Sequence, residues 1–151
     1  MKRSAGILPY KIINNEIYVY LEHPGGPYWK NIEKYSICKG EYDNEKAIDA
    51  AIREFKEESG FEIKKEELIY LKSHKISNNK ILTIFIINKD LDPEKMTSNT
   101  FKKEFANGEI KEFPEMDKAC WLKLDEAQKY IFDSQIYFIE ALKEKLKMEV
   151  L

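Results

Sequence analysis

The stretch KGEYDNEKAIDAAIREFKEESGF, residues 39–61, contains the features that decide the fold. Its turn-rich start leads into a helix predicted over about residues 44–59, with Asp43 or Asn44 available as the cap. Gly60 follows, and a glycine in the left-handed conformation there would end the helix. Apolar side chains recur along the helix at three- and four-residue spacing and predict a stripe that packs on a core. The stripe consists of Ile48, Ala51, Ile52 and Phe55.

A second face of the same helix collects carboxylates. Glu54, Glu57 and Glu58 are spaced i, i+3 and i+4, which brings their side chains to one surface at roughly 100° per residue. Like charges one turn apart repel and raise one another's pKa. A hard divalent cation that prefers oxygen ligands, Mg²⁺ or Mn²⁺, would turn this repulsion into binding and would hold a polyphosphate. The alternative is a solvated charged face that Arg53 and Lys56 partly neutralise.

The segment resembles the Nudix box, G-x5-E-x7-R-E-U-x-E-E-x-G-U, in which U is a bulky apolar residue. Every fixed position from Glu45 to Phe61 is filled, and Glu45 is expected in the first turn of the helix. Only four residues separate Gly40 from Glu45 where the pattern has five, so this loop is one residue shorter. Further stretches look like a Nudix subgroup of predicted NTP pyrophosphohydrolases: HPGGPYW at 23–29, SNTF at 98–101 and EFPEMDKACW at 112–121.

The resemblance implies both a fold and an activity. The expected fold is α/β, a Nudix-type α/β/α sandwich around a mixed β-sheet, with residues 1–151 as a single domain. The expected activity is metal-dependent hydrolysis of a pyrophosphate bond in an NTP, a modified NTP or a dinucleoside polyphosphate. A nucleotide-binding or regulatory Nudix module with little turnover is the alternative, and the shortened loop is its only support. A third hypothesis is a protein that interacts through its helical surface.

Family roles carry over to matching positions of the box. By resemblance, Glu57 and Glu58 are metal ligands, and Glu54 is a further ligand or the general base. A main-chain carbonyl at Lys39 or Gly40 is another expected ligand. The resemblance thus predicts a Mg²⁺ or Mn²⁺ site in which the helical glutamates provide most of the ligands.

Other charged residues are expected to support that site. Arg53 is expected to take part in catalysis, and with Glu45 it resembles the ion pair that holds the loop on the helix. Three acids follow later in the chain, near a junction between loop and strand: Glu112, Glu115 and Asp117. Each of them either adds a late carboxylate to the metal site or keeps the loop in water.

The stretch HPGGPYW, residues 23–29, is predicted to be a shaped loop because two prolines and two glycines forbid regular structure. Tyr28 and Trp29 are candidates for substrate binding, with aromatics packed on the core as the alternative. His23 is a general base, a phosphate hydrogen-bond donor or a loop residue. Lys39 is a further candidate for substrate binding.

Composition limits the classes of partner. The formal net charge of −2 gives no basic field of the kind that attracts polymeric nucleic acid, so a small-molecule nucleotide is the expected partner. No apolar run approaches the roughly 18 residues needed to span a bilayer, and no apolar signal core follows the N-terminus. A cytoplasmic monomer or homodimer is expected. Cys38 and Cys120 are predicted to be buried thiols rather than a disulfide or a metal site.

The remaining pattern predicts strands and two late helices. Strands are expected over residues 3–13 and 17–22, joined at Asn14 and Asn15, with Pro9 marking an edge or an irregularity. Further expected elements, in order, are a short strand at 35–38, strands at 66–77 and 80–88 joined at Asn78 and Asn79, a strand around 120–122, and helices from Asp125 and over 134–147.

The run ILTIFII at residues 81–87 predicts a central strand that is buried on both faces. Residues 91–108 are expected to be irregular, with a helical turn at 94–96. In that segment, Lys102 and Lys103 are either phosphate contacts or a solvated pair.

Overall fold

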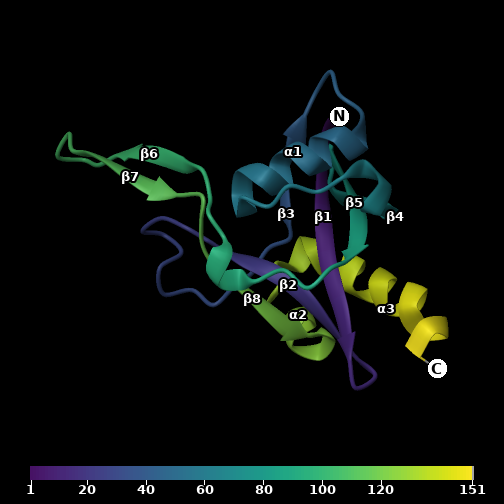
Figure 1. Cartoon of the computed structure of the whole chain (residues 1–151). Coiled ribbons are helices and arrows are strands. Elements are labelled where there is room, and N and C mark those ends of the chain that lie inside the picture. Colours follow the sequence, from purple (N-terminus) through teal and green to yellow (C-terminus); the bar gives the residue numbers. More distant parts are fainter. Residues whose placement is uncertain (151) are drawn as a thin grey trace.

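The structure, a computed structural model, describes residues 1–150 and the side chains of residues 1–147. Its strands and helices are drawn in Figure 1. In chain order they are β1 (Lys2–Ile13), β2 (Glu16–Pro24), β3 (Cys38–Tyr42), α1 (Ala47–Ser59), η1 (Lys65–Glu67), β4 (Ile69–Ser77), β5 (Lys80–Asn88), η2 (Pro93–Lys95), β6 (Thr100–Glu104), β7 (Ile110–Pro114), β8 (Met116–Lys123), α2 (Leu124–Tyr130), η3 (Asp133–Gln135) and α3 (Ile136–Val150).

The main sheet is mixed and has the strand order β4-β5-β1-β2-β8, with β3 also paired to β1. β1 runs parallel to β5 and antiparallel to β2 and β3. On one side, its residues from Arg3 to Ile7 pair with β3, and those from Tyr10 to Ile13 pair with β2. Pro9 lies between these pairings, so the predicted irregularity is confirmed. The edge alternative is wrong, because β1 has partners on both sides.

Each face of this sheet carries its own core, as expected for an α/β/α sandwich. Successive residues of β1 point to opposite faces, so Ile7 packs under α1 while Leu8 packs under α2 and α3. β5 is central and largely buried, as the apolar run predicts. Cys38 is buried and Cys120 half-buried, and both thiols are free. They belong to opposite faces of the sheet, which excludes a disulfide between them in this fold.

Helix α1 differs at its start from the sequence prediction. It begins at Ala47 rather than near residue 44, and its N-cap residue Lys46 makes no side-chain capping hydrogen bond. Asp43 therefore does not cap the helix, nor does Asn44, and Glu45 precedes the helix instead of lying in its first turn. The reason is the compact bend before the helix, where the Glu45 amide donates to the Asp43 carbonyl at 2.7 Å.

The other end and the buried face of α1 agree better with the prediction. Gly60 ends the helix in the left-handed conformation, with a φ of 81°. Within the apolar stripe, Ala51 and Phe55 are buried, whereas Ile48 and Ile52 are only half-buried. The buried face of α1 is therefore shifted around the helix from the predicted stripe. Its described members are Ala50, Ala51, Phe55, Glu58 and Ser59.

Two local predictions are wrong and several are confirmed. Tyr35 and Ser36 form isolated bridges, and the strand begins only at Cys38. Residues 100–104 are not irregular: they form β6, which pairs with β7 in a separate two-stranded sheet. The turns at Asn14–Asn15 and Asn78–Asn79 connect antiparallel strands as expected. The helical turn near residue 94 and both late helices are also present, with α3 beginning at Ile136.

Candidate active site

The carboxylates of α1 lie directly over β3. Pairing with β1 fixes β3 under the helix, and the Glu54 carboxyl rests on the backbone of Gly40. A β-carbon at position 40 would lie 2.0 Å from Glu54 Cδ, so only a glycine permits this contact. Glu54 has a side chain that is only 12% exposed. The contact places its carboxylate beside the main chain that the sequence identified as a source of ligands.

Glu58 is buried against the same strand. Its Oε1 accepts a hydrogen bond from the Lys39 amide at 3.1 Å. Burial is the main cause that raises the pKa of Glu58, to about 9, and the negative charges of Glu22, Glu54 and Glu115 add to it. Burial also lowers the pKa of the Lys39 ammonium. The carboxylates therefore repel one another in a poorly solvated environment, and the hydrogen bond from Lys39 offsets this only partly.

Arg53 joins the loop to the carboxylate face. Its Nε and Nη2 both donate to Glu45, with an Nη2 to Oε1 distance of 2.6 Å. Its Nη1 donates to Glu54 at 2.9 Å and to Glu57 at 3.4 Å. The ion pair expected between Arg53 and Glu45 is thus formed even though the preceding loop is one residue shorter. Such a fork fixes the carboxylates geometrically as well as by charge.

The three late acids go to three different places. Glu115, half-buried at the junction of β7 and β8, lies close enough to the α1 carboxylates for its charge to raise the pKa of Glu54 and Glu58. Its own pKa is raised by burial and then by the charge of Glu57. Glu112 lies on β7 opposite Lys102 and is exposed. Asp117 pairs with His23. Of the three, Glu115 alone lies beside the carboxylates of α1.

Glu22 is a site residue that the sequence reasoning missed. It is fully buried on β2, its Oε2 accepts a hydrogen bond from the Tyr20 hydroxyl, and its Oε1 has no hydrogen-bond partner. Burial raises its pKa to about 7, against the opposing effects of Tyr20 and Cys38. The available signal was strand periodicity, because Tyr20 and Glu22 share the face that α1 covers.

The predicted substrate loop is only partly a loop. His23 belongs to β2, and both of its ring nitrogens are engaged, Nδ1 with Asp117 at 2.7 Å and Nε2 with the Ile32 carbonyl at 2.8 Å. This arrangement makes His23 a support of the loop rather than a free base. Tyr28 is 72% exposed and contacts Trp29 edge to face, with ring centroids 4.7 Å apart. Trp29 in turn packs on Phe132, as the packing alternative expects, and substrate binding by these aromatics stays a prediction.

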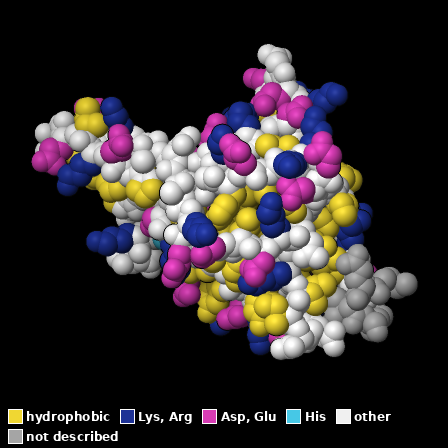
Figure 2. Space-filling model, viewed as in Figure 1, with side chains coloured by type: hydrophobic (Ala, Val, Ile, Leu, Met, Phe, Trp, Pro, Cys, Tyr) yellow, Lys and Arg dark blue, Asp and Glu magenta, His cyan; other side chains and the backbone are white. Residues whose placement is uncertain are grey.

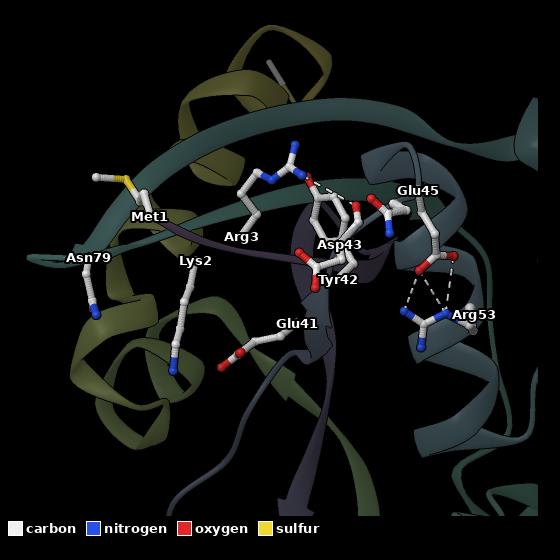
Figure 3. Close-up of a pocket in the computed structure, with 10 residues that line it drawn as sticks. Met1, Lys2, Arg3, Glu41, Tyr42, Asp43, Glu45, Arg53 and Asn79 are labelled. Atoms are coloured by element: carbon white, nitrogen blue, oxygen red, sulfur yellow. Dashed lines mark hydrogen bonds and ion pairs between the residues drawn. The ribbon is translucent and has the colours of Figure 1, made fainter.

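A wide pocket of about 680 Å³ lies on the other side of Arg53. Figure 3 shows the pocket between the start of β1 and the bend before α1, with the ion pair between Glu45 and Arg53 at its edge. Of its charged residues, Glu41 pairs with Lys80 and Glu45 with Arg53, while Arg3 donates to the Asp43 carbonyl. It meets the carboxylate cluster only through Arg53 and Glu45. The carboxylates of α1 are therefore kept as the candidate site.

A family model described as NUDIX domain matches residues 10–142. The chain belongs to the Nudix family. The family model therefore places the chain among the Nudix hydrolases, whose general activity is the hydrolysis of nucleotide pyrophosphate bonds. Among curated proteins there is no significant match.

Solved Nudix structures share the fold at low sequence identity. An Ap4A hydrolase binary complex from C. elegans is 19% identical and has a TM-score of 0.63, over 98% of this chain and 99% of that one. The NUDIX domain of Shewanella oneidensis NrtR complexed with ADP ribose is 10% identical, with a TM-score of 0.67, over 95% and 87%. A MutT/nudix family protein from Enterococcus faecalis is 15% identical, with a TM-score of 0.58, over 81% of this chain and 43% of that one.

The residues of this Nudix hydrolase fit a divalent cation of the hard type. The available donors are carboxylate oxygens and main-chain carbonyls, the set that Mg²⁺ and Mn²⁺ prefer. Within residues 1–147, no three acidic, histidine or cysteine side chains converge on one point as they stand. Hydrogen bonds are the reason, because Arg53 donates to Glu54 and Glu57 while the Lys39 amide donates to Glu58. Rotation of these side chains would make the oxygens available.

None of the helices in the described part of the chain has the length and apolar character of a membrane-spanning helix.

Replacing Gly40 by alanine is expected to displace the Glu54 carboxylate and to weaken Mn²⁺ binding by about tenfold or more, because the new methyl group occupies the carboxylate's position. Calorimetric titration with Mn²⁺ measures this directly. Gly108→Ala is the matched control: it also places alanine at a glycine, with a φ of 87°, but far from any neighbouring atom. Equal Mn²⁺ affinity in Gly40→Ala and the parent protein would contradict the assignment of Glu54.

Proposed function

We propose that this Nudix hydrolase cleaves a pyrophosphate bond in a nucleoside polyphosphate, with Mg²⁺ or Mn²⁺ held by Glu54, Glu57 and Glu58. The candidate substrates are an NTP, a modified NTP or a dinucleoside polyphosphate. The observation that carries the proposal is that Glu54 lies on Gly40 and Glu58 on the Lys39 amide, with Glu57 and Glu115 close enough for their charges to raise the pKa of Glu54. Arg53 supplies one positive charge to Glu54 and Glu57, and a divalent cation would supply the further charge that favours ionised carboxylates here.

The chain's own residues would divide the work as follows. The glutamates of α1 and a carbonyl of Lys39 or Gly40 hold the metal, and Glu54 is the further ligand or the general base. When bound, the metal supplies charge neutralisation on the phosphate oxygens and an acidified water. Arg53 keeps Glu54 and Glu57 in place while its other edge is fixed by Glu45. Glu115 is the extra carboxylate nearest to this group.

The substrate's nucleoside is expected on the side of the 23–34 segment. Tyr28 offers an exposed ring for a base, and Trp29 steadies that ring from behind. His23 holds the loop through Asp117 and Ile32. The proposed substrate is a small nucleotide, and the proposed enzyme is a cytoplasmic monomer or homodimer.

Turnover is favoured over binding alone by the bend before α1. The shorter loop was the reason to consider a regulatory module, because it put in doubt how the carbonyls of Lys39 and Gly40 are presented to a metal. The ion pair between Glu45 and Arg53 at the end of this loop is bidentate, which supports an intact catalytic box.

A panel of NTPs, oxidised NTPs, dinucleoside polyphosphates and nucleotide sugars, incubated with Mg²⁺ or Mn²⁺, is expected to yield mononucleotide or phosphate products from at least one class. Mass spectrometry of the products identifies both the substrate and the bond that is cleaved. Chelation of the metal is expected to stop the reaction. Tight nucleotide binding with no turnover across the panel would support the regulatory module instead.

A further inference from the structure

β6 and β7 form an arm, residues 100–114, that stands apart from the main sheet. The two strands pair with each other and make a separate two-stranded sheet. Figure 1 shows the arm projecting from the body of the molecule, and Figure 2 shows apolar and charged side chains along it. An exposed hairpin of this length is stabilised little by burial of apolar surface, so packing of the core does not explain its side chains.

Side-chain alternation gives the arm two different faces. The first, here called the aromatic-basic face, is defined by Phe101, Lys103, Phe105, Lys111 and Phe113. Contacts confirm that these residues share one side. Ring centroids of Phe113 lie 5.9 Å from Phe101 and 6.3 Å from Phe105, and Lys111 Nζ lies 5.4 Å from the Phe105 ring.

Positive charge on the aromatic-basic face is poorly compensated. Lys103 lies directly opposite Lys111, an arrangement that costs stability. Lys111 approaches Glu109 at 3.7 Å, whereas Lys103 has no ion pair in the part of the chain that the structure describes. On the other face, Lys102 lies opposite Glu112. An anion bound between Lys103 and Lys111 would relieve the repulsion that only one face carries.

Main-chain hydrogen bonds join the base of the arm to helix α1, which carries the candidate site. The Asn99 amide donates to the Glu57 carbonyl at 2.7 Å, and the Glu115 amide donates to the Asn99 carbonyl at 2.8 Å. Phe101 packs on Gly26, where a β-carbon would lie 2.9 Å from Phe101 Cζ. Because Phe101 belongs to the aromatic-basic face, this face turns toward the segment that carries Tyr28.

The reach of the arm selects the part of a ligand that it could touch. Lys103 lies four residues beyond Asn99, which corresponds to about 13 Å at roughly 3.3 Å per residue in a strand. This distance is too long for the phosphate under attack at the carboxylates. It suits a group at the far end of a polyphosphate chain whose near end is at the metal site.

Building on the proposed hydrolase function, we propose that the aromatic-basic face is a second nucleotide subsite. It takes the distal nucleotide of a dinucleoside polyphosphate, with Lys103 and Lys111 on the phosphates and the ring of Phe105 beside the base. Charged hydrogen bonds from the lysines and base stacking on an aromatic ring are both established ways to hold a nucleotide. A dinucleoside polyphosphate is then the preferred substrate, and an NTP is a substrate that uses only the metal site.

The double variant Lys103→Ala/Lys111→Ala tests this subsite. Its KM for a dinucleoside tetraphosphate is expected to rise about tenfold or more, from the loss of two charged contacts, with kcat nearly unchanged. Its KM for an NTP is expected to stay the same, because an NTP does not reach the arm. Lys102→Ala, on the opposite face, is the matched control and is expected to change neither value. An equal rise for both substrates, or none for the dinucleotide, would overturn the proposal.

Binding without turnover separates this proposal from the proposed function. In a Glu57→Gln background, calorimetry with the dinucleoside tetraphosphate is expected to show weaker binding in the double variant than in its parent. If the wild type hydrolyses no nucleotide but this difference is present, the hydrolase proposal fails and the subsite stands. If the wild type hydrolyses nucleotides and the two affinities are equal, the subsite fails alone. Circular dichroism and the melting temperature verify that the variants are folded.

Discussion

Replacing Glu57 by glutamine is expected to lower kcat for nucleotide hydrolysis by about 10³-fold or more, a loss of roughly 4 kcal/mol of transition-state stabilisation. Glutamine keeps the volume of the side chain and can still face Arg53 Nη1, which lies 3.4 Å from the Glu57 carboxylate. What it removes is the negative charge that would hold a divalent cation. Steady-state hydrolysis with Mg²⁺, with products identified by mass, measures the effect, and Glu58→Gln is expected to behave in the same way.

The control for Glu57→Gln is Glu62→Gln. Glu62 lies just beyond α1 and forms an exposed ion pair with Lys56 at 2.8 Å, away from the carboxylate cluster. Surface pairs of this kind contribute little, so Glu62→Gln is expected to keep full activity and stability. Full activity in both Glu57→Gln and Glu58→Gln would remove the metal-dependent mechanism, whereas a loss in Glu62→Gln as well would indicate a general effect of charge.

The helix of the box could be predicted from the sequence because its geometry is local. A spacing of three and four residues fixes which side chains share a face, so Glu54, Glu57 and Glu58 come from neighbouring positions of α1, although within residues 1–147 their side chains do not meet at one point. The start of the helix depends on a long-range interaction instead. Arg53 forms a bidentate ion pair with Glu45. Because the chain bends before the helix to place Glu45 in this pair, the helix begins only at Ala47.

Elements stabilised by distant partners were harder to predict. β6 has no long apolar run, and its partner β7 follows only after the turn at Asn107 and Gly108, so the segment was read as irregular. Glu22 was hidden for a similar reason. It ends an apolar run at the tip of β2, where a carboxylate normally faces water, and only the placement of α1 over that face buries it. Sequence spacing gives the face of a strand, but not what covers it.

The second large effect is expected in the stability of the metal-free protein, which should fall as the pH rises from about 5 to 9. Glu58 has a pKa raised to about 9 and Glu22 one raised to about 7, both mainly by burial, from an ordinary value of 4.5. Between these values the folded protein keeps the protons that the unfolded chain releases. Because the unfolded chain then binds fewer protons, the free energy of unfolding decreases with pH.

Thermal unfolding followed across this pH range, with chelator and with Mn²⁺, measures the effect. The shift at Glu22 alone corresponds to roughly 3 kcal/mol, at about 1.4 kcal/mol for each pKa unit. Mn²⁺ is expected to raise the melting temperature most at high pH, because the cation binds the ionised carboxylates and offsets their repulsion.

Glu22→Gln separates the two carboxyl groups. Glutamine retains an oxygen for the Tyr20 hydroxyl but cannot ionise, so this variant is expected to be more stable than the parent at pH 8 and nearly equal to it at pH 5. The remaining decrease up to pH 9 then belongs to Glu58 together with Glu54 and Glu115, whose pKa values are also raised, and it should be the part that Mn²⁺ reverses. A metal-free melting temperature that stays constant from pH 5 to 9, or rises, would show that these carboxyls are not held protonated by the fold.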